Sequence, residues 1–468
     1  MTNPPSAALE LGTERIRKLL VQYAVPAIIA MTASSLYNMV DSIFIGHGVG
    51  PLAISGLALT FPLMNLAAAF GSLVGVGAAT LISMRLGQRD YDTAQRVLGN
   101  VVILNLIIGI LFGGAALIFL DPILYFFGAS DATIGYAREY MSIILWGNVV
   151  THMYLGLNAV LRASGHPRKS MYATINTVLI NTALDPLFIY GFGWGIRGAA
   201  IATVLAQIIS LVWQFYLLSD KKELLHFRRG IYRLKRKIVR NILAIGLSPF
   251  LMNLAACFIA ILINKGLKQY GDDLAIGAYG IVNRLAFFFV MIVMGINQGM
   301  QPIAGYNFGA RQFDRVLRVL KLTVIGAITV TSCGFIIGEF LPRTAVSLFT
   351  SDAELIRIAI EGMRITFIFF PIIGFQMVST NFFQSIGMAG KAIFLSLTRQ
   401  LLFLLPGLIL LPRLFEHYTD WDGSWGVWCA LPLSDLMASI VAFILLTREL
   451  RRFRASIRPV QNTTSHAR

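Results

Sequence analysis

The stretch Ser34–Gly48, SSLYNMVDSIFIGHG, places a carboxylate in the middle of a hydrophobic run. Apolar sequence precedes it from Val25 and resumes after a short Gly/Pro break, so the Asp41 side chain cannot reach water from a nearby loop. A carboxylate at membrane depth costs about 2.5 to 3.5 kcal/mol on insertion scales, which points to a pathway, a proton site or a buried partner. Asn38 stands three residues earlier and shares its helix face. The alternative is that Asp41 only locks helices together through buried hydrogen bonds.

The composition places the chain among polytopic membrane proteins. Of its 468 residues, 56% are hydrophobic and only 13% are charged, and the mean hydropathy is +0.70. These values lie far from the balance of a soluble globular protein. The cysteines Cys257, Cys333 and Cys429 have neither paired nor metal-ligand spacing, so we expect no disulfide framework and no zinc site. The polar segment Met1–Thr13 has no signal-peptide pattern.

Apolar runs long enough for a membrane helix of about 20 residues recur about twelve times. We therefore expect an all-α fold with about twelve transmembrane helices. The expected spans are residues 17–46, 53–84, 94–120, 135–163, 169–190, 196–217, 238–266, 275–305, 316–341, 356–386, 391–412 and 424–448. Prolines inside spans remove a backbone donor, so each is a candidate kink: Pro26, Pro62, Pro249, Pro302, Pro371, Pro406 and Pro432.

Positive charge is distributed unequally between the two sides of these spans. With both termini placed inside, 29 of the 39 lysines and arginines fall in inner loops and tails, 7 in outer loops and 3 within spans. This bias predicts a multi-pass protein of the cytoplasmic (inner) membrane with both termini in the cytoplasm. The net charge of +16 is then a topology signal, and we expect no nucleic-acid partner.

The densest basic segment divides the chain into two halves. We expect a first six-helix bundle in residues 1–220, a basic cytoplasmic linker in residues 221–240, and a second six-helix bundle with a basic tail in residues 241–468. The linker is expected to lie against the anionic inner leaflet.

The two halves repeat each other at an offset of 222 residues. The sequence GQRDYDTAQRVL from Gly87 aligns with GARQFDRVLRVL from Gly309, and Leu52-Ala-Ile aligns with Leu274-Ala-Ile. Six spans per half is an even number, so both copies have the same membrane orientation. Such duplication predicts two homologous bundles around a central cleft that opens alternately to each side.

Carboxylates within spans distinguish the first half from the second. Asp41 aligns with about Ile263 or Asn264 and Asp185 aligns with about Gly407, so neither carboxylate has a counterpart. Asn181 precedes Asp185 by four residues and shares its helix face. Further oxygen-bearing side chains in this half are Asn38, Tyr140, Asn158, Thr203 and Gln207. Such a cluster could ligate a sodium ion or hold a proton between its carboxyl groups, and the sequence leaves both open.

These features together resemble the multidrug and toxic compound extrusion (MATE) family. The resemblance rests on Asn38-x-x-Asp41-x-x-Phe44-x-Gly46, on the loop from Gly87 with its repeat from Gly309, on the loops at Gly165 and Gly387, and on the twelve spans, and it extends from about Ile16 to Arg452. It implies two six-helix bundles and the export of cationic amphiphilic drugs in exchange for sodium ions or protons.

Within this family the chain resembles the DinF-type, MepA-like branch, for which the resemblance implies a coupling cluster in the first bundle. That carries over to four candidate sodium ligands, with Tyr140 and Asn158 as neighbours: Asp41, Asn181, Asp185 and Thr203. The NorM-type branch uses carboxylates in spans seven and ten, whereas residues 246–262 and 364–384 contain no Asp or Glu. We therefore expect no cation site of that type.

The second half carries a different set of charges within its spans, namely Arg284, Arg399 and Asp435. Asp435 either pairs with one of the arginines, since unpaired charge is costly at that depth, or these groups serve substrate release or bundle closure.

A cleft for varied flat substrates is expected to be lined by adaptable apolar side chains. The candidates are Met31, Met39, Met64, Phe61, Phe287, Met291 and Met294.

Several function classes lack their motifs in this sequence. No G-x-x-x-x-G-K-S/T, H-E-x-x-H or nucleophile-elbow pattern is present, so we expect neither an enzyme nor any cofactor besides a transported proton or sodium ion. The prediction is a monomeric secondary antiporter that exports cationic amphiphilic compounds and contacts membrane lipids. The alternative is a flippase or exporter of lipid-linked saccharides of the same wider superfamily, which would need a cationic cleft for pyrophosphate. The duplicated bundles disfavour a passive channel.

Overall fold

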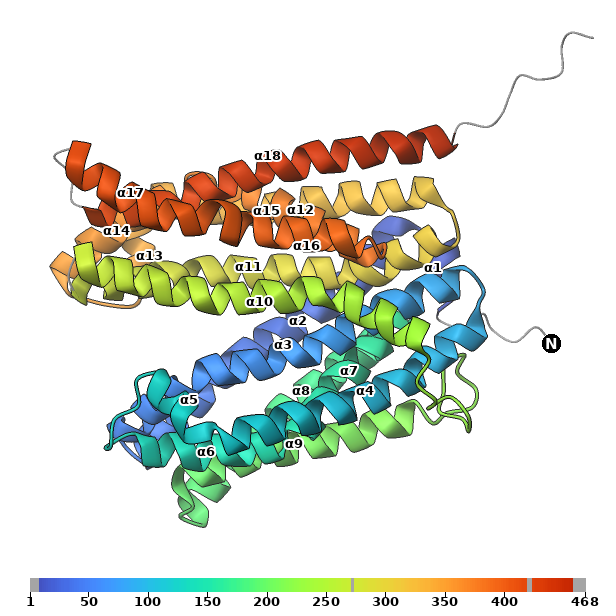
Figure 1. Ribbon diagram of the computed structural model, residues 1–468, viewed down its shortest axis with the longest axis horizontal. Coiled ribbons are helices and arrows are strands. Elements are labelled where there is room, and N and C mark those ends of the chain that lie inside the picture. The colour runs from blue at the N-terminus through green and yellow to red at the C-terminus, as the bar shows by residue number, and fades with distance from the viewer. Residues whose placement is uncertain (1–7, 271–272, 419–422, 458–468) are drawn as a thin grey trace, which may run out of the picture.

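The computed structural model describes residues 8–270, 273–418 and 423–457. The side chains of Asn38 and Met39, two of the predicted site residues, lie outside the described part. The chain forms two helical bundles that follow each other in sequence (Figure 1). We call α2–α9 the N bundle and α10–α18 the C bundle.

The N bundle contains six crossings and two short elements. Its long helices are α2 (Ile16–Gly48), α3 (Pro51–Gly87), α4 (Tyr91–Ile118), α6 (Ile134–Trp146) with α7 (Asn148–Ala163), α8 (Pro167–Pro186) and α9 (Gly195–Leu217). The short elements are α5 (Leu120–Phe126) and the π-helical turn η1 (Leu187–Gly191). The short helix α1 (Glu10–Thr13) precedes the bundle and packs against Tyr306 and Asn307 of the C bundle.

The C bundle has the same plan. Its long helices are α10 (Arg236–Tyr270), α11 (Asp273–Gly309), α12 (Phe313–Phe340), α14 (Ala353–Phe367) with α15 (Phe370–Ser385), α16 (Ala389–Leu397) with α17 (Leu405–Tyr418), and α18 (Gly423–Ile457). The short helix α13 (Pro342–Ser347) follows α12, and the π-helical segment η2 (Thr398–Leu404) joins α16 to α17.

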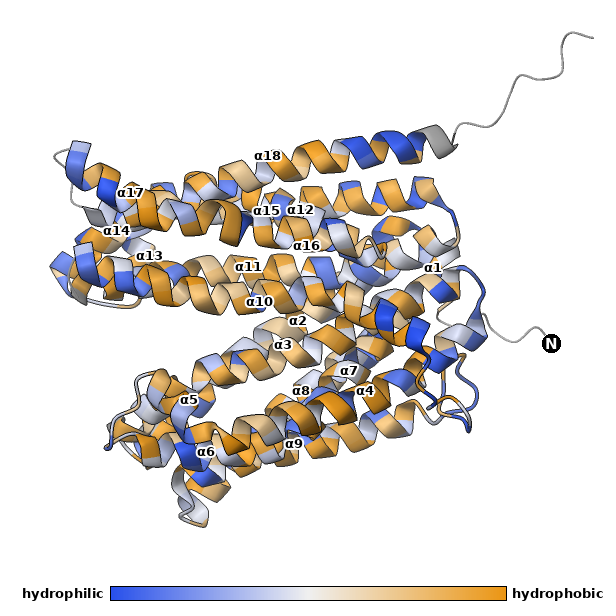
Figure 2. Ribbon diagram, in the orientation of Figure 1, coloured by the Kyte–Doolittle hydropathy of each residue, from blue (hydrophilic) through white to orange (hydrophobic). Residues whose placement is uncertain are grey.

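The described residues confirm the predicted all-α membrane fold. Within them, nine helices are long and apolar enough to cross a membrane, and two bent pairs add one crossing each. The remaining crossing is α8, whose 20 residues are less apolar because polar side chains recur along one face. Figure 2 shows apolar residues along the middle of the helices and polar residues gathered at their ends.

Two spans expected to be continuous are broken. The helices α6 and α7 meet at Gly147 with a bend of 55°, and α14 and α15 meet with a bend of 52°. In the second case Pro371 lies in the first turn of α15, where it cannot donate to the preceding turn. Glycine and proline at these breaks account for the difference from the expected spans.

The backbone preserves the internal repeat. The turns after α3 and α11 each contain an arginine in the left-handed region, Arg89 with φ 60° and Arg311 with φ 57°. They lie 222 residues apart, as the repeated sequences from Gly87 and Gly309 require. The helices preceding them both have 37 residues, and the helices following them both have 28.

The two bundles share a core at one end of the molecule and have separate cores at the other. The shared core lies at the end where the lysine- and arginine-rich segments 85–96, 162–169, 221–240 and 311–321 are found, which we call the basic end. It combines Ile82 of the N bundle with Ile303 of the C bundle. At the opposite end each bundle packs around its own core, and Figure 1 shows the ribbons diverging there.

Glycines allow the bundles to meet closely at the basic end. A Cβ atom on Gly77 of α3 would lie 2.0 Å from the carbonyl oxygen of Ile242 in α10. One on Gly246 of α10 would lie 1.7 Å from the carbonyl oxygen of Leu73 in α3. The two helix backbones are therefore in direct contact, which only glycine permits at these positions.

Candidate functional site

Two carboxyl groups face each other inside the N bundle. Asp41 of α2 is 5% exposed and Asp185, near the end of α8, is fully buried. The two carboxyl groups are close enough to interact electrostatically. Two such groups in a low-dielectric interior require a proton or a cation between them, because two bare negative charges repel. We call Asp41 and Asp185 the carboxyl pair.

Asn181 completes one side of the carboxyl pair. It stands one turn before Asp185 on α8, and its Nδ2 donates to Asp185 Oδ1 at 3.0 Å. The chain then widens into the π-helical turn η1 directly after Pro186. Such irregular turns are frequent at functional sites.

Hydroxyl groups surround the other side. Thr203 of α9 donates from Oγ1 to the carbonyl oxygen of Ala199 at 3.0 Å. The Tyr37 hydroxyl lies 3.0 Å from Thr203 Oγ1 and therefore donates to it. Tyr140 of α6 is 1% exposed and lies within reach of Thr203. Sequence reasoning missed Tyr37, although it precedes Asp41 by four residues and shares its helix face.

The structure therefore brings together Asp41, Asp185, Asn181, Thr203 and Tyr140. It places Asn158 elsewhere. Asn158 Nδ2 donates to Thr174 Oγ1 at 2.9 Å, and Thr174 precedes Asp185 by eleven residues on α8, about 16 Å along the helix axis. Asn158 thus belongs to a second polar group nearer the basic end.

The donor set suits a hard cation as well as a proton. Within the described part of the chain, three buried oxygens of the site have no protein partner: Asp41 Oδ1, Asp185 Oδ2 and Asn181 Oδ1. Carboxylate, amide and hydroxyl oxygens are the ligands that hard cations prefer. The same part of the chain contains no group of three or more His, Cys, Asp or Glu that could hold a metal ion.

The C bundle deals with its buried charges differently. Arg399, in the π-helical segment η2, forms an ion pair with Asp435 of α18, and Asp435 is only 3% exposed. The second arginine, Arg284 of α11, is exposed and forms no ion pair with any residue that the structure describes. The ion pair that the sequence suggested between Asp435 and an arginine is therefore present, and the arginine is Arg399. A role of these charges in substrate release or bundle closure stays a prediction.

The predicted cleft residues have varied positions. Met31 Sδ lies 3.3 Å from Nε2 of Gln298 in the C bundle, so it stands between the bundles. Met64 packs against the N-bundle core at the opposite end, and Phe61 and Phe287 are 55% and 50% exposed. Met291 and Met294 are half-buried. The lining of a substrate path by these side chains stays a prediction.

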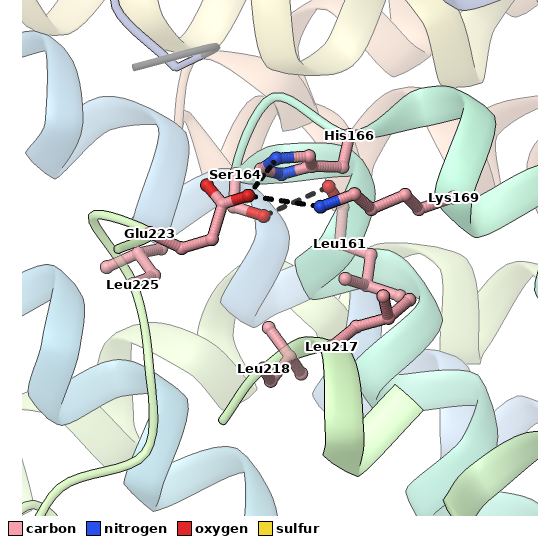
Figure 3. A pocket seen from close by; sticks show the side chains of 8 residues that line it. All are labelled: Leu161, Ser164, His166, Lys169, Leu217, Leu218, Glu223 and Leu225. Atoms are coloured by element: carbon pink, nitrogen blue, oxygen red, sulfur yellow. Dashed lines mark hydrogen bonds and ion pairs between the residues drawn. The ribbon is translucent and has the colours of Figure 1, made fainter. Parts of the chain in front are cut away.

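A separate charged cluster lies at the basic end. Glu223, in the segment between the bundles, is 2.9 Å from His166 Nε2 and 3.0 Å from Lys169 Nζ (Figure 3). These contacts line a cavity of about 10 Å³, enough for one water at most. Burial lowers the pKa of the His166 imidazole, with Glu223 opposing that effect. The cluster ties the connecting segment to α8.

Comparison with known proteins extends over nearly the whole chain. A family model described as MatE matches residues 26–187 and 249–409. The multidrug export protein MepA of Staphylococcus haemolyticus is 27% identical over 430 residues, which are 92% of this chain and 93% of that protein. MepA of Staphylococcus aureus (strain NCTC 8325) is also 27% identical, over 438 residues, with 92% and 94% covered.

Solved structures agree with this similarity. The MATE multidrug transporter DinF-BH, solved in complex with the dye rhodamine 6G, is 35% identical, with a TM-score of 0.85 over 94% of this chain and 98% of that one. An outward-facing conformation of a multidrug resistance MATE family transporter is 25% identical, with a TM-score of 0.88 over 97% and 100%. Because the family model matches both halves and more than half of the sequence, the chain belongs to the MATE family of membrane transporters.

Proposed function

We propose that this chain is a secondary antiporter that exports cationic amphiphilic compounds in exchange for protons or sodium ions bound at the carboxyl pair. It works as a monomer in the cytoplasmic membrane, with both termini and the basic end in the cytoplasm, and uses no cofactor besides the coupling ion. The export of drugs follows its relatives, which are named multidrug export proteins. A similar transporter has been solved with rhodamine 6G.

The observation that supports coupling at this site is the buried carboxyl pair with its unpartnered oxygens. An ionisable pair kept inside a membrane helix bundle is costly and is retained for an ion or substrate pathway. The anionic character of the pair attracts a cation, and a cationic substrate nearby would compete with it.

The helix that carries Asp41 also connects the two bundles. It packs against α8 in the N bundle and against α11 in the C bundle. At the second contact, Gly299 and Gly295 of α11 are so close to Ala24 and Ile28 that an added Cβ would lie 2.6 Å from each. Pro26 lies between these two positions, and it lacks the backbone donor that would stiffen the helix there.

A coupling mechanism follows from this connection. Binding of the ion changes the charge on Asp41 and so the packing of α2 against α8. Because α2 is also held by α11, the change bends the helix near Pro26 and alters the contact between the bundles. Substrate and coupling ion then weaken each other's binding by the same factor, as linkage requires.

A lipid-linked saccharide flippase is less well supported. Such a substrate carries pyrophosphate and needs unpaired cations along the cleft. Arg399 is neutralised by Asp435, and the buried charges of the N bundle near α2 are carboxyl groups. The charge of the interior therefore favours a cation.

The test is flux of a fluorescent lipophilic cation such as rhodamine 6G in vesicles containing the purified protein. A proton gradient and a sodium gradient are imposed separately, with Asp41→Asn beside wild type at matched reconstitution. We expect one gradient to drive dye movement and the substitution to abolish it. Equal transport by wild type and Asp41→Asn would remove Asp41 from the mechanism, and no movement under either gradient would overturn the antiport proposal.

A further inference from the structure

A column of hydroxyl and amide side chains runs inside the N bundle from the carboxyl pair toward the basic end. On α8 the polar residues recur every three or four positions, which places them on one helix face: Ser170, Thr174, Thr177, Asn181 and Asp185. Helices α7 and α9 pack against α8 and face it with polar residues of the same spacing. We call this set the hydroxyl column.

The middle of the column joins three helices. Thr177 Oγ1 of α8 lies 2.7 Å from Ser210 Oγ of α9. The hydroxyl of Tyr154 in α7 is within reach of Thr174, Thr177 and Asn158, and Tyr154 is 6% exposed. A chain of hydroxyl groups therefore continues through the bundle interior below the carboxyl pair.

The column continues to the basic end without an apolar interruption. Asn158 Nδ2 donates to Thr174 at 2.9 Å, and Asn158 Oδ1 accepts from Ser170 Oγ. Arg162 Nη1 then donates to Ser170 Oγ at 3.3 Å. Ser170 follows Lys169 in sequence, so the column ends beside the charged cluster of Figure 3.

Unpartnered polar atoms occur at both ends of the column. In the residues that the structure describes, Asn181 Oδ1 and Asp185 Oδ2 lack a protein partner at one end, and Arg162 Nε lacks one at the other. Buried polar atoms are almost always hydrogen-bonded, and water supplies the partner where protein does not. Water at these positions would bridge the turn between Asn181 and Thr177 and open the column to the basic end.

We infer that the coupling ion is a proton and that it travels between the carboxyl pair and the cytoplasm through the hydroxyl column rather than through the central cleft. This inference rests on the proposed function. Each hydroxyl group or bridging water accepts one proton and donates another, so a proton that leaves the carboxyl pair leads to the release of a different proton into cytoplasmic water. The amide of Asn158 does not relay protons, so water must carry the proton past it between Thr174 and Ser170, and then only O–H bonds are made and broken. Separate routes keep proton and substrate from meeting in one passage.

The same geometry argues against a sodium ion on this route. The contacts at 2.7 to 2.9 Å hold hydroxyl and amide groups against each other, and a ligated cation would have to separate them. The guanidinium of Arg162 stands at the basic end of the column, where its charge repels any cation in the column and favours release to water.

The experiment compares three variants by gradient-driven rhodamine 6G flux in vesicles and by equilibrium binding of the same dye to the purified protein. Thr177→Val removes the bridging hydroxyl and keeps the shape of the side chain. Thr177→Ser keeps the hydroxyl. Thr323→Val is the matched control, because Thr323 is fully buried in the C bundle and its hydroxyl donates within its own helix, to the carbonyl oxygen of Val319.

We expect proton-driven flux to fall about tenfold in Thr177→Val, which corresponds to ~1.4 kcal/mol in the barrier. Thr177→Ser and Thr323→Val should keep wild-type flux, and dye binding should be unchanged in all three. Wild-type flux in Thr177→Val would overturn the proposed proton route through the hydroxyl column. So would a loss of dye binding in Thr177→Val that is proportional to its loss of flux. A wild-type protein driven by sodium alone would overturn it and leave antiport standing, whereas a wild-type protein driven by neither gradient would overturn both.

Discussion

The two bundles have the same architecture and treat buried charge in opposite ways. In the N bundle, Asp41 faces Asp185, and each carboxyl group has an oxygen without a protein partner in the described structure. In the C bundle, Asp435 is equally buried but forms an ion pair with Arg399. One bundle therefore has an incomplete polar site, and the other has a satisfied one.

This difference separates a working group from a structural one within a single fold. A satisfied buried ion pair stabilises or specifies a structure, although a hydrophobic replacement is often no worse. An unsatisfied carboxyl pair costs free energy, and a ligand that binds there recovers part of it. The burial of a carboxylate alone would not distinguish the two cases, since Asp41 and Asp435 are both at most 5% exposed.

The largest expected effect contrasts a substitution in each bundle. Asp185→Asn should abolish gradient-driven flux, because an amide cannot release a proton or balance the charge of a cation, while the fold persists. Asp435→Asn should leave flux gradient-dependent but destabilise the protein by about 3 kcal/mol, since it leaves the charge of Arg399 without its carboxylate partner. Flux in vesicles and thermal unfolding of the purified protein measure the two effects separately.

A double substitution provides the control for this contrast. Arg399→Met with Asp435→Leu removes both charges of the C-bundle pair and should recover most of the stability lost in Asp435→Asn. If this double variant instead loses coupling while it folds normally, the C bundle takes part in ion exchange and the contrast between the bundles fails.

The next effect concerns the contact between the bundles. Gly246→Ala places a Cβ 1.7 Å from the carbonyl oxygen of Leu73, and backbone on both sides must move. Overpacking of this kind costs about 1 to 3 kcal/mol, so the bundles should separate at the basic end. Ser83 is fully buried beside α11. The thiol of an added Ser83→Cys substitution should therefore react with a maleimide supplied from the basic end faster in Gly246→Ala than in the protein without that substitution.

Gly114→Ala is the matched control for this substitution. It lies in α4, and an added Cβ there would meet nothing within 4 Å. When Gly114→Ala is combined with Ser83→Cys, maleimide should label the cysteine at position 83 at the same rate as in the protein that carries Ser83→Cys alone. Equal labelling of Gly246→Ala and Gly114→Ala would show that the close approach of α3 and α10 does not hold the basic end closed.

The sequence predicted the fold well because its signals are long and repeated. Twelve apolar runs, an even number of spans per half and the repeat between Gly87 and Gly309 are enough to give two parallel bundles, and the twin arginine turns confirm the repeat. The bend at Gly147 was not predicted, because apolar composition continues across it, whereas the bend before Pro371 lies at one of the prolines expected to mark a kink.

The site was only partly predictable. Asp41, Asp185 and Asn181 stand out as polar residues in apolar helices, and the structure brings them together. Asn158 looks equivalent in sequence but lies near the other end of α8, because sequence gives no distance between helices. Tyr37 was missed because aromatic residues in membrane helices more often pack than donate hydrogen bonds.

The smallest expected effect compares equivalent positions of the repeat at the basic end. Lys169 and Lys391, 222 residues apart, each pair with a carboxylate, but the residue three positions before them is His166 in the N bundle and Met388 in the C bundle. Burial lowers the pKa of His166 from an ordinary value of about 6.5, so folding favours its neutral form. The stability from this group is present above that value and is lost as pH falls below it.

His166→Met, which copies the C-bundle residue, should therefore flatten part of the fall in thermal stability between pH 7 and pH 5. The thermal midpoint of the purified protein is measured at several pH values for both proteins, and the carboxylates that titrate in both cancel in the difference. Glu223 and Lys169 remain in the variant. A constant offset between the two curves of thermal midpoint against pH therefore reports the lost His166 contact, and only a difference in their slopes reports protonation of His166. Parallel curves would mean that His166 is protonated as easily in the folded protein as in the unfolded chain, and the difference between the two copies of the repeat at this position would then have no effect on the pH dependence of stability.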